Sequence, residues 1–394
     1  MFRQQMGRSQ RFGRHPMASN SRSERPQRQF SDVSKFINRA LPMTEAKLYV
    51  AVNSFTDFPV DERLRKNVLH VGYETPMPIQ DQAIPYILAG RDLVGIANTG
   101  TGKTAAFAIP LLDKVMKDKK QKVLIVAPTR ELAIQINEEL IKLAFGLGIF
   151  SVCVVGGMPI FRQINDLRRH HNFVIGTPGR LKDLIDRGCL ELASFQTIVL
   201  DEADRMLDMG FINDMRFLMK AMPKNRQTLF FSATLSGDIK NIIKEFLTDP
   251  VSISVKTGDT PREVDQDVIY VRNETKIDLL HDLLIQPEFH KVLIFGSTKH
   301  GVERLSRLLA TRGFKAESIH GNKNHSQRQR ALNSFKNDTI KVLVATDVAA
   351  RGLDIPDVSH VINYELPATY EDYIHRIGRT GRAGKTGKAL TFIE

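Results

Sequence analysis

The chain has 394 residues, enough for two domains of ordinary size, because a single core seldom grows past roughly 250 to 300 residues. Its apolar share of 42% is ordinary for a globular protein, and no apolar run reaches the roughly 18 residues of a membrane helix. These values exclude a membrane-spanning protein and favour a cytoplasmic one. The only cysteines, Cys153 and Cys189, lack metal-ligand spacing, which excludes a disulfide framework and a zinc site and suits a reducing compartment.

The formal net charge of +12 is concentrated at the N-terminus. Residues 1–40 hold nine Lys or Arg against Glu24 and Asp32, with few apolar residues to bury. A disordered basic tail is therefore predicted over residues 1–50, because burial cannot offset the entropy of ordering. A salt-sensitive contact with a phosphate backbone and a purely solubilising role fit the tail about equally. A mitochondrial transit peptide shares the Arg bias, but this stretch lacks an apolar helical face.

From Asp92 onward, short apolar runs alternate with amphipathic helical patterns. Buried strands are predicted at residues 92–97, 122–127, 173–176, 197–200 and 228–231. This alternation implies parallel strands joined by right-handed crossovers, with helices on both faces of the sheet. We therefore predict an α/β domain over residues 82–255, whose ligands bind beyond the carboxyl ends of the strands.

The alternation lapses over residues 255–261, and we predict a linker at residues 256–264. A second alternating set predicts a second α/β domain over residues 265–394. Its strands are expected at 267–271, 291–295, 316–320, 341–345 and 360–364. Residues 122–129 and 291–298 match at five of eight positions, as if the two domains followed one plan. The predicted fold class is thus two tandem α/β domains, each a mainly parallel sheet covered on both faces.

A phosphate-binding loop is predicted between the strand at 92–97 and the helix that follows it. The loop comprises Thr99, Gly100, Thr101, Gly102, Lys103 and Thr104, and Ala97 and Asn98 precede it. Backbone N–H groups and the helix N-terminus would bind phosphate oxygens, Lys103 would reach the β- and γ-phosphates, and the Thr104 hydroxyl would ligate Mg²⁺. The full pattern has a glycine where this chain has Ala97. For the loop alone, a plain Gly-rich turn is the alternative.

An acidic quartet, Asp201-Glu202-Ala203-Asp204, ends the apolar run at 198–200. Its carboxylates should emerge at the same sheet edge as the phosphate loop. Asp201 would bind Mg²⁺, usually through water, and Glu202 would orient and deprotonate the attacking water. An acidic pair alone is as readily a solvated strand end. Downstream of a phosphate loop, the quartet indicates a nucleotide-driven motor.

With these motifs in this order, the chain resembles the DEAD-box RNA helicases of superfamily 2, and the resemblance extends from Phe55 to Ile393. It implies two RecA-like domains that use ATP and Mg²⁺. Residues 72–80 look like the Q motif, within a region spanning 53–81, where the Gln80 amide reads the adenine edge and Phe55 packs on the base. From the residues alone, Phe55 reads as a core side chain.

The resemblance also implies RNA contacts in both domains. Those of the first domain are Pro128, Thr129, Arg130, Gly156, Gly157, Thr177, Pro178, Gly179 and Arg180, and those of the second are Gln327, Arg330, Thr346 and Arg351. Hydroxyls, guanidinium groups and glycine-exposed N–H groups bind phosphate and sugar without reading base edges. Each first-domain element alone would read as a helix-capping loop, and a solvated helix face remains the alternative for Gln327 and Arg330.

The second domain packs Arg376, Arg379 and Arg382 at a spacing of three among glycines. A developing phosphoryl charge calls for guanidinium groups supplied across a cleft, and by resemblance Arg379 and Arg382 are the arginine fingers. The resemblance further implies that His375 bridges to the first domain and that Arg351 links the RNA and ATP sites. It places Gly352 and Asp354 near the nucleotide, and it makes Ser232 and Thr234 the coupling between hydrolysis and RNA through the acidic quartet.

Hydrolysis is then expected only when the two domains close around ATP. The resemblance implies RNA-stimulated conversion of ATP to ADP and phosphate, coupled to local, non-processive unwinding or remodelling of RNA duplexes or RNA–protein complexes. Single-stranded RNA and short duplexes would be bound largely independently of sequence, and the 2′-OH would distinguish RNA from DNA. The alternatives are a DNA-directed helicase, not expected to carry the Gln80 region, and an ATP-dependent RNA clamp that does not unwind. The sequence stops at Glu394, directly after a further predicted strand, where family members usually continue with a helix, which leaves open whether the sequence is a fragment.

Overall fold

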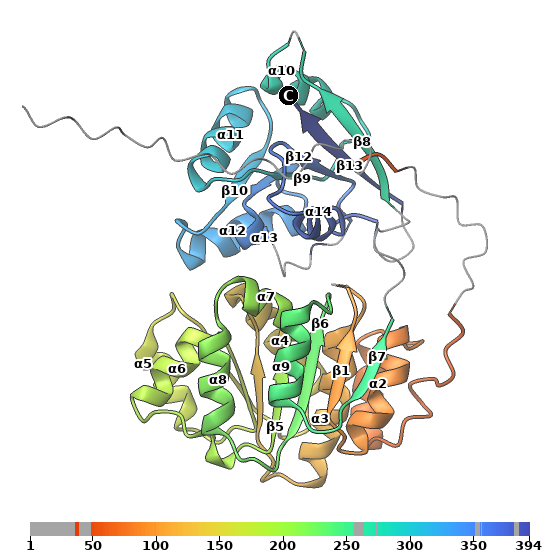
Figure 1. Ribbon diagram of the computed structural model, residues 1–394, viewed down its shortest axis with the longest axis vertical. Helices are drawn as coiled ribbons and strands as arrows, with labels where there is room; N and C mark the ends of the chain where they lie inside the picture. Colours follow the sequence, from red (N-terminus) through yellow and green to blue (C-terminus); the bar gives the residue numbers. More distant parts are fainter. Residues whose placement is uncertain are drawn as a thin grey trace, which may run out of the picture.

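A computed structural model describes residues 36–38, 49–98, 100–255, 264–272, 274–350, 355, 357–381 and 386–394. These residues form two α/β domains, stacked along the long axis of the molecule in Figure 1. No helix in the described ranges is both long and apolar enough to span a bilayer. Five predicted site residues lie outside the described residues: Thr99, Arg351, Gly352, Asp354 and Arg382.

The first domain contains a seven-stranded sheet in the order β3-β4-β2-β5-β6-β1-β7, with every neighbouring pair parallel. The strands are β1 (Leu93–Ile96), β2 (Val123–Val126), β3 (Ser151–Val154), β4 (Phe173–Gly176), β5 (Thr197–Leu200), β6 (Gln227–Ser232) and β7 (Val251–Ser254). The strands β1, β2, β4, β5 and β6 are buried along their whole length, as expected when helices cover both faces. The parallel architecture predicted from the alternating pattern is confirmed.

Alternate residues of these strands feed two separate cores, one on each face of the sheet. One core is covered by α1 (Glu62–His70), α2 (Pro78–Leu88), α3 (Lys103–Lys117) and α4 (Arg130–Leu143). The other is covered by α5 (Ile160–Leu167), α6 (Pro178–Asp186), α7 (Ala203–Asp208), α8 (Ile212–Ala221) and α9 (Gly237–Phe246), near the short η2 (Leu192–Ser194). The phosphate loop and the acidic quartet therefore open the helices α3 and α7 on opposite faces of one sheet.

The second domain repeats this plan with a six-stranded parallel sheet in the order β10-β11-β9-β12-β13-β8. Its strands are β8 (Val264–Tyr270), β9 (Val292–Phe295), β10 (Ala316–Ile319), β11 (Val342–Ala345), β12 (His360–Asn363) and β13 (Gly387–Ile393). One face is covered by α12 (His325–Lys336), α13 (Asp347–Ala350) and α14 (Tyr370–Ile377), and the other by α10 (Lys276–Leu284) and α11 (Lys299–Thr311). The two RecA-like domains predicted by the resemblance are confirmed.

Three strands depart from the sequence prediction, and all three lie at sheet edges. The strands β3 and β7 were not predicted, and β8 begins at Val264 rather than at residue 267. Their burial patterns are interrupted by half-buried and exposed positions, since an edge strand has solvent on one side. Of the predicted linker 256–264, only Val264 is among the described residues, and it belongs to β8.

Within the predicted tail, residues 36–38 contact the second domain. Phe36 is buried in the core beside Val264 and Tyr373, and Asn38 forms an antiparallel bridge with Gln266 of β8. The tail prediction did not include this contact. The contact places a segment from the start of the chain against the domain that is synthesised last.

Candidate active site

The phosphate loop curls between the end of β1 and the start of α3. Gly102 caps α3 in the left-handed region at φ +83°, where a Cβ would lie 2.3 Å from the Gln80 Nε2 atom. Only glycine meets both requirements. The Thr101 hydroxyl donates to the Asn98 carbonyl at 2.8 Å, which holds the loop in its curled form. The N-terminus of α3 consequently opens toward a cavity.

Lys103 connects the phosphate loop to the acidic quartet. Its Nζ atom donates to the Ala97 carbonyl at 3.1 Å and lies 4.0 Å from the Asp201 Oδ1 atom, and both side chains are buried. Burial raises the pKa of the Asp201 carboxyl to about 6; the Lys103 ammonium opposes that rise, and Glu202 adds to it. The prediction that these two motifs meet at one sheet edge therefore agrees with the geometry.

Glu202 adopts a strained backbone conformation at the start of α7. Its φ of 50° and ψ of 52° fall in the left-handed region, which is uncommon for a residue with a side chain. The side chain is buried, and its Oε2 atom lies 4.0 Å from the Arg205 Nη1 atom. Glu202 lines the same cavity as Lys103 and Thr104. Such outliers are concentrated at functional sites, where surrounding contacts hold them.

Asp204 joins the quartet to the Ser232-Ala233-Thr234 segment. Its Oδ2 atom accepts hydrogen bonds from the Ala233 and Thr234 backbone N–H groups, both at 3.0 Å, and from the Thr234 hydroxyl at 3.2 Å. The Ser232 hydroxyl donates to the Thr234 carbonyl at 2.8 Å. Because β6 lies between β1 and β5, this segment emerges between the phosphate loop and the quartet. The resemblance predicted a contact between this segment and the quartet, but it did not identify Asp204 as the residue that makes it.

A cavity of about 730 Å³ extends from these residues toward the N-terminus of α2. Gln80 lines it, with Nε2 donating to the Gly102 carbonyl at 3.1 Å and Oε1 accepting from the Met77 N–H at 2.8 Å. Phe55 does not line it: this ring is buried between Phe58 and Tyr73, and Tyr73 faces the cavity instead. The volume falls in the range of nucleotide-sized ligands.

Thr104 and Asp201 are the oxygen donors at this cavity that fit a magnesium ion. No cluster of three or more His, Cys, Asp or Glu side chains able to hold a metal occurs among the described residues. One carboxylate and one hydroxyl do not fill an octahedral shell, which agrees with a cation that keeps its waters and arrives with substrate phosphates. The raised pKa of Asp201 fits as well, because a nearby cation would stabilise its charged form.

Two residues of the second domain, His375 and Arg379, lie next to the acidic quartet. Both line a small cavity together with Glu202, Asp204, Arg205 and Ala233 of the first domain. Arg379 follows α14 and is 3% exposed, and its Nε atom donates to the His375 carbonyl at 3.3 Å. The structure thus brings one predicted arginine finger to the predicted catalytic carboxylates.

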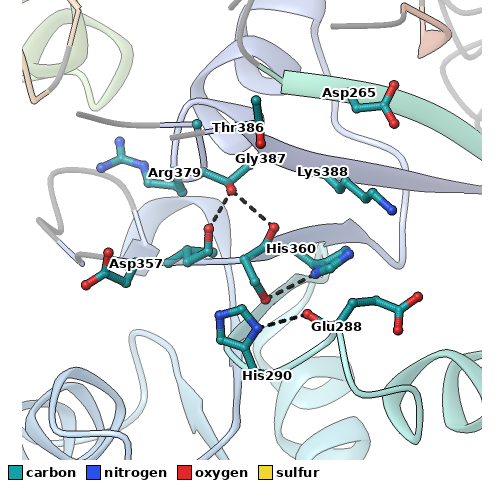
Figure 2. Close-up of a pocket in the computed structure, with 13 residues that line it drawn as sticks. Asp265, Glu288, His290, Asp357, His360, Arg379, Thr386, Gly387 and Lys388 are labelled. Carbon is teal, nitrogen blue, oxygen red and sulfur yellow. Dashed lines mark hydrogen bonds between the residues drawn. The ribbon is translucent and has the colours of Figure 1, made fainter. Parts of the chain in front are cut away.

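Arg379 also borders a separate cavity of about 740 Å³ at the amino ends of β8, β12 and β13, shown in Figure 2. Acidic Asp265, Glu288 and Asp357 alternate there with basic His290 and Lys388, a mixture that selects no single class of ligand. His360 stacks on Phe289 with ring centroids 3.8 Å apart. Burial lowers the pKa of His360 to about 4, so this imidazole is neutral and has a packing role.

Two polar contacts that the sequence did not predict join the domains. The Arg328 Nη2 atom of α12 lies 2.9 Å from the Glu131 Oε2 atom of α4, and both side chains are largely buried. The Arg205 Nη2 atom donates to the Val348 carbonyl of α13 at 2.9 Å. Long-range pairs of this kind leave no local pattern in a sequence.

A cavity of about 420 Å³ lies beside the Glu131–Arg328 pair. Its walls include Pro128, Thr129, Arg130, Gly156, Thr177, Gly179 and Arg180 of the first domain, and Gly321, Arg328 and Val348 of the second. Arg130 packs over Gly157, where a Cβ would lie 2.2 Å from its Nη1 atom. Three guanidinium groups around one opening suit a polyanion.

Three predicted nucleic-acid contacts of the second domain are not part of this cavity. The Gln327 Oε1 atom accepts from the Asn324 N–H at 3.0 Å and so completes the capping box of α12. Arg330 is exposed on the same helix, and Thr346 is buried at the end of β11. Gln327 therefore has a helix-capping role in this structure, and its contact with RNA stays a prediction.

Comparisons with known proteins agree with this geometry. The family described as DEAD/DEAH box helicase matches residues 77–242, and the helicase conserved C-terminal domain matches residues 275–384. The ATP-dependent RNA helicase CshA of Listeria monocytogenes is 47% identical over 345 residues, covering 87% of this chain and 66% of that protein. The CshA protein of Bacillus subtilis is 46% identical over 342 residues, and the match covers 86% of this chain and 69% of the Bacillus subtilis protein. This chain thus spans about two thirds of the length of these relatives.

Among solved structures, S. cerevisiae Dbp5 bound to RNA and ADP BeF3 is similar to both domains together. The TM-score is 0.78 at 31% identity, and the match covers 86% of this chain and 89% of that one. The arrangement of the two domains therefore resembles one seen with RNA and a nucleotide analogue present.

Proposed function

This chain belongs to the DEAD/DEAH box helicase family, and on that premise we propose that it is an ATP-dependent RNA helicase. It hydrolyses ATP to ADP and phosphate when RNA is bound, and it separates short duplexes locally. The observation that carries the proposal is the meeting of Glu202 with Arg379 across the two domains, next to Lys103 and Asp201. Catalytic parts divided between two domains make hydrolysis depend on their closure.

ATP occupies the cavity of about 730 Å³, with its phosphates at the N-terminus of α3. Lys103 contacts the β- and γ-phosphates, and Gln80 recognises the adenine edge. Thr104 and Asp201 would hold Mg²⁺, which would supply positive charge to offset that of the phosphates. Glu202 orients the attacking water and accepts its proton, while Arg379 stabilises the charge that develops on the transferred phosphoryl group.

RNA binds across the cavity of about 420 Å³ and touches both domains. Arg130 and Arg180 contact its phosphates together with the backbone at Gly156 and Gly179, so recognition is largely independent of sequence. RNA that spans the domains favours the arrangement in which Arg379 reaches the quartet. By linkage, closure around ATP strengthens RNA binding by the same factor.

The proposal also covers the domain boundaries and the cellular location of the protein. We assign residues 53–81 to the Q-motif region, 82–255 to the first RecA-like domain and 264–394 to the second, which begins with β8 at Val264. A cytoplasmic location is supported by the free thiols of Cys153 and Cys189, which a reducing compartment preserves.

One experiment separates this activity from its rivals. ATP turnover of the purified chain is measured with single-stranded RNA, with single-stranded DNA of the same sequence, and with neither, and a short labelled RNA duplex reports strand separation. We expect stimulation by RNA well above that by DNA, together with ATP-dependent release of the labelled strand. Equal stimulation by DNA would indicate the DNA-directed alternative. RNA-stimulated turnover without strand release would indicate a clamp.

A further inference from the structure

The segment at residues 36–38 is inserted into the second domain, although it precedes the first domain in the sequence. Phe36 is 1% exposed, and its ring meets Tyr373 edge-on with centroids 4.8 Å apart. The Asn38 N–H donates to the Gln266 carbonyl at 3.0 Å, and the Gln266 N–H donates to the Asn38 carbonyl at 2.7 Å. The segment thus pairs with the edge of the six-stranded sheet, where β8 would otherwise present unpaired backbone groups.

The contact leads directly to α14, the helix that ends just before Arg379. The Tyr373 hydroxyl donates to the Gln266 Oε1 atom at 3.0 Å, so Gln266 bonds the segment through its backbone and α14 through its side chain. Tyr373 itself is fully buried. One turn of helix separates Tyr373 from Arg376, and Arg379 comes two residues after the end of the helix at Ile377.

A second anchor holds the next turn of α14. The Arg376 Nε and Nη2 atoms lie 2.6 and 2.7 Å from the two Asp347 carboxylate oxygens, and Nη1 donates to the Glu365 carbonyl at 2.7 Å. This pair fixes the C-terminal half of α14 from within the second domain. Phe36 fills an apolar socket beside Val264 and Tyr373, which belong to the same cluster of buried side chains. The N-terminal half of α14 therefore depends on this socket being filled.

We propose that Phe36 is a positioning residue for the arginine finger: by filling the socket against Tyr373 and pairing with β8, residues 36–38 hold α14 so that Arg379 reaches the acidic quartet. This inference rests on the proposed ATP hydrolysis. The segment lies outside the residues matched by either domain family, which begin at residue 77. The same chain is held on the first domain close behind, where the Asp81 carboxylate accepts from the Val52 N–H at 2.8 Å and from the Tyr49 hydroxyl at 2.6 Å.

Docking of the segment can be measured without any activity. The backbone N–H of Gln266 donates to the Asn38 carbonyl, so its hydrogen exchange reports whether the segment is docked. In the full chain we expect this amide to be protected, and Phe36→Ala should speed its exchange by about tenfold or more. Ile37→Ala is the matched control, because Ile37 is adjacent and 48% exposed. An unprotected Gln266 amide in the unmodified chain would overturn the docking.

The positioning role is tested by steady-state ATP hydrolysis at saturating RNA. Phe36→Ala should lower kcat by about tenfold while KM for ATP stays within about twofold, because the nucleotide cavity is built almost entirely from the first domain. Phe36→Leu keeps an apolar anchor and should recover most of the rate, and Ile37→Ala should match the unmodified chain. Asn38→Pro removes one bridge hydrogen bond without touching the socket, so it should give an intermediate kcat.

Two outcomes separate the inference from the proposed function. If Phe36→Ala releases the Gln266 amide but leaves kcat unchanged, or raises KM and kcat together, the positioning role is wrong. If the unmodified chain shows no RNA-stimulated turnover, the proposed function fails, and amide exchange still decides whether the segment docks.

Discussion

The Glu131–Arg328 ion pair should contribute to closure of the two domains around RNA. The Nη2–Oε2 distance is 2.9 Å, and the side chains are 3% and 12% exposed for Glu131 and Arg328. One partner is on α4 of the first domain and the other on α12 of the second. Separation of the domains would return both charges to water, so loss of the pair should penalise the closed arrangement and leave each domain's own stability unchanged.

The size of this effect follows from burial. Close charge pairs at desolvated interfaces show coupling free energies from about 1.5 kcal/mol upward. The adjoining cavity of about 420 Å³ admits water to one side of the pair, so we expect a value near the lower end. A coupling of about 2 kcal/mol corresponds to roughly a thirtyfold change in affinity for RNA.

The assay is a double-mutant cycle on RNA affinity in the presence of a non-hydrolysable ATP analogue. Glu131→Ala and Arg328→Ala should each weaken binding by roughly thirtyfold, and the double variant should bind about as well as either single one. Any direct contact of Arg328 with RNA cancels in the cycle. Arg216 and Glu245 are also 2.9 Å apart, but they lie within one domain and are about half exposed, so Arg216→Ala is a matched control without effect. Additive losses in the double variant would refute the coupling.

Three further predictions concern the nucleotide cavity. Glu202→Gln should leave ATP affinity unchanged and abolish turnover, because the amide cannot accept a proton; normal turnover in a phosphate-release assay would contradict that role. Burial raises the pKa of Asp201 to about 6 in the free protein, and only the carboxylate form can hold Mg²⁺. The value of kcat/KM for ATP should therefore fall as the pH drops through about 6. A flat profile between pH 5 and 7 would exclude this role for Asp201. Gly102→Ala should weaken ATP binding by about tenfold or more, because its Cβ would lie 2.3 Å from the Gln80 Nε2 atom. Gly90→Ala shares the positive φ without any nearby atom, so it should leave ATP binding intact in the same titration.

The sequence predicted the centre of each sheet better than its edges. Central strands such as Val123–Val126 are buried on both faces and read as continuous apolar runs. At β3 and β7 only some positions are buried, and the residues between them read as loop. The predicted start of β8 was wrong by three residues, because the residues before the exposed Asp267 also read as loop.

For the active site, the sequence predicted what the backbone topology alone determines. Parallel strands end at one sheet edge, so Lys103 and Asp201 could be placed together before any coordinates. Contacts between side chains could not be derived in this way. The placement of Tyr73 rather than Phe55 on the cavity wall depends on how three aromatic rings pack, and the sequence does not encode that packing locally.

The insertion of Phe36 into the second domain has a consequence for synthesis of the protein. At roughly 5 to 20 residues per second, Tyr373 is made roughly 15 to 70 s after Phe36. The first domain can therefore fold on the ribosome before the second domain, and with it the socket for Phe36, has been synthesised. Loss of the Phe36 ring should therefore disturb the last step of folding rather than the first.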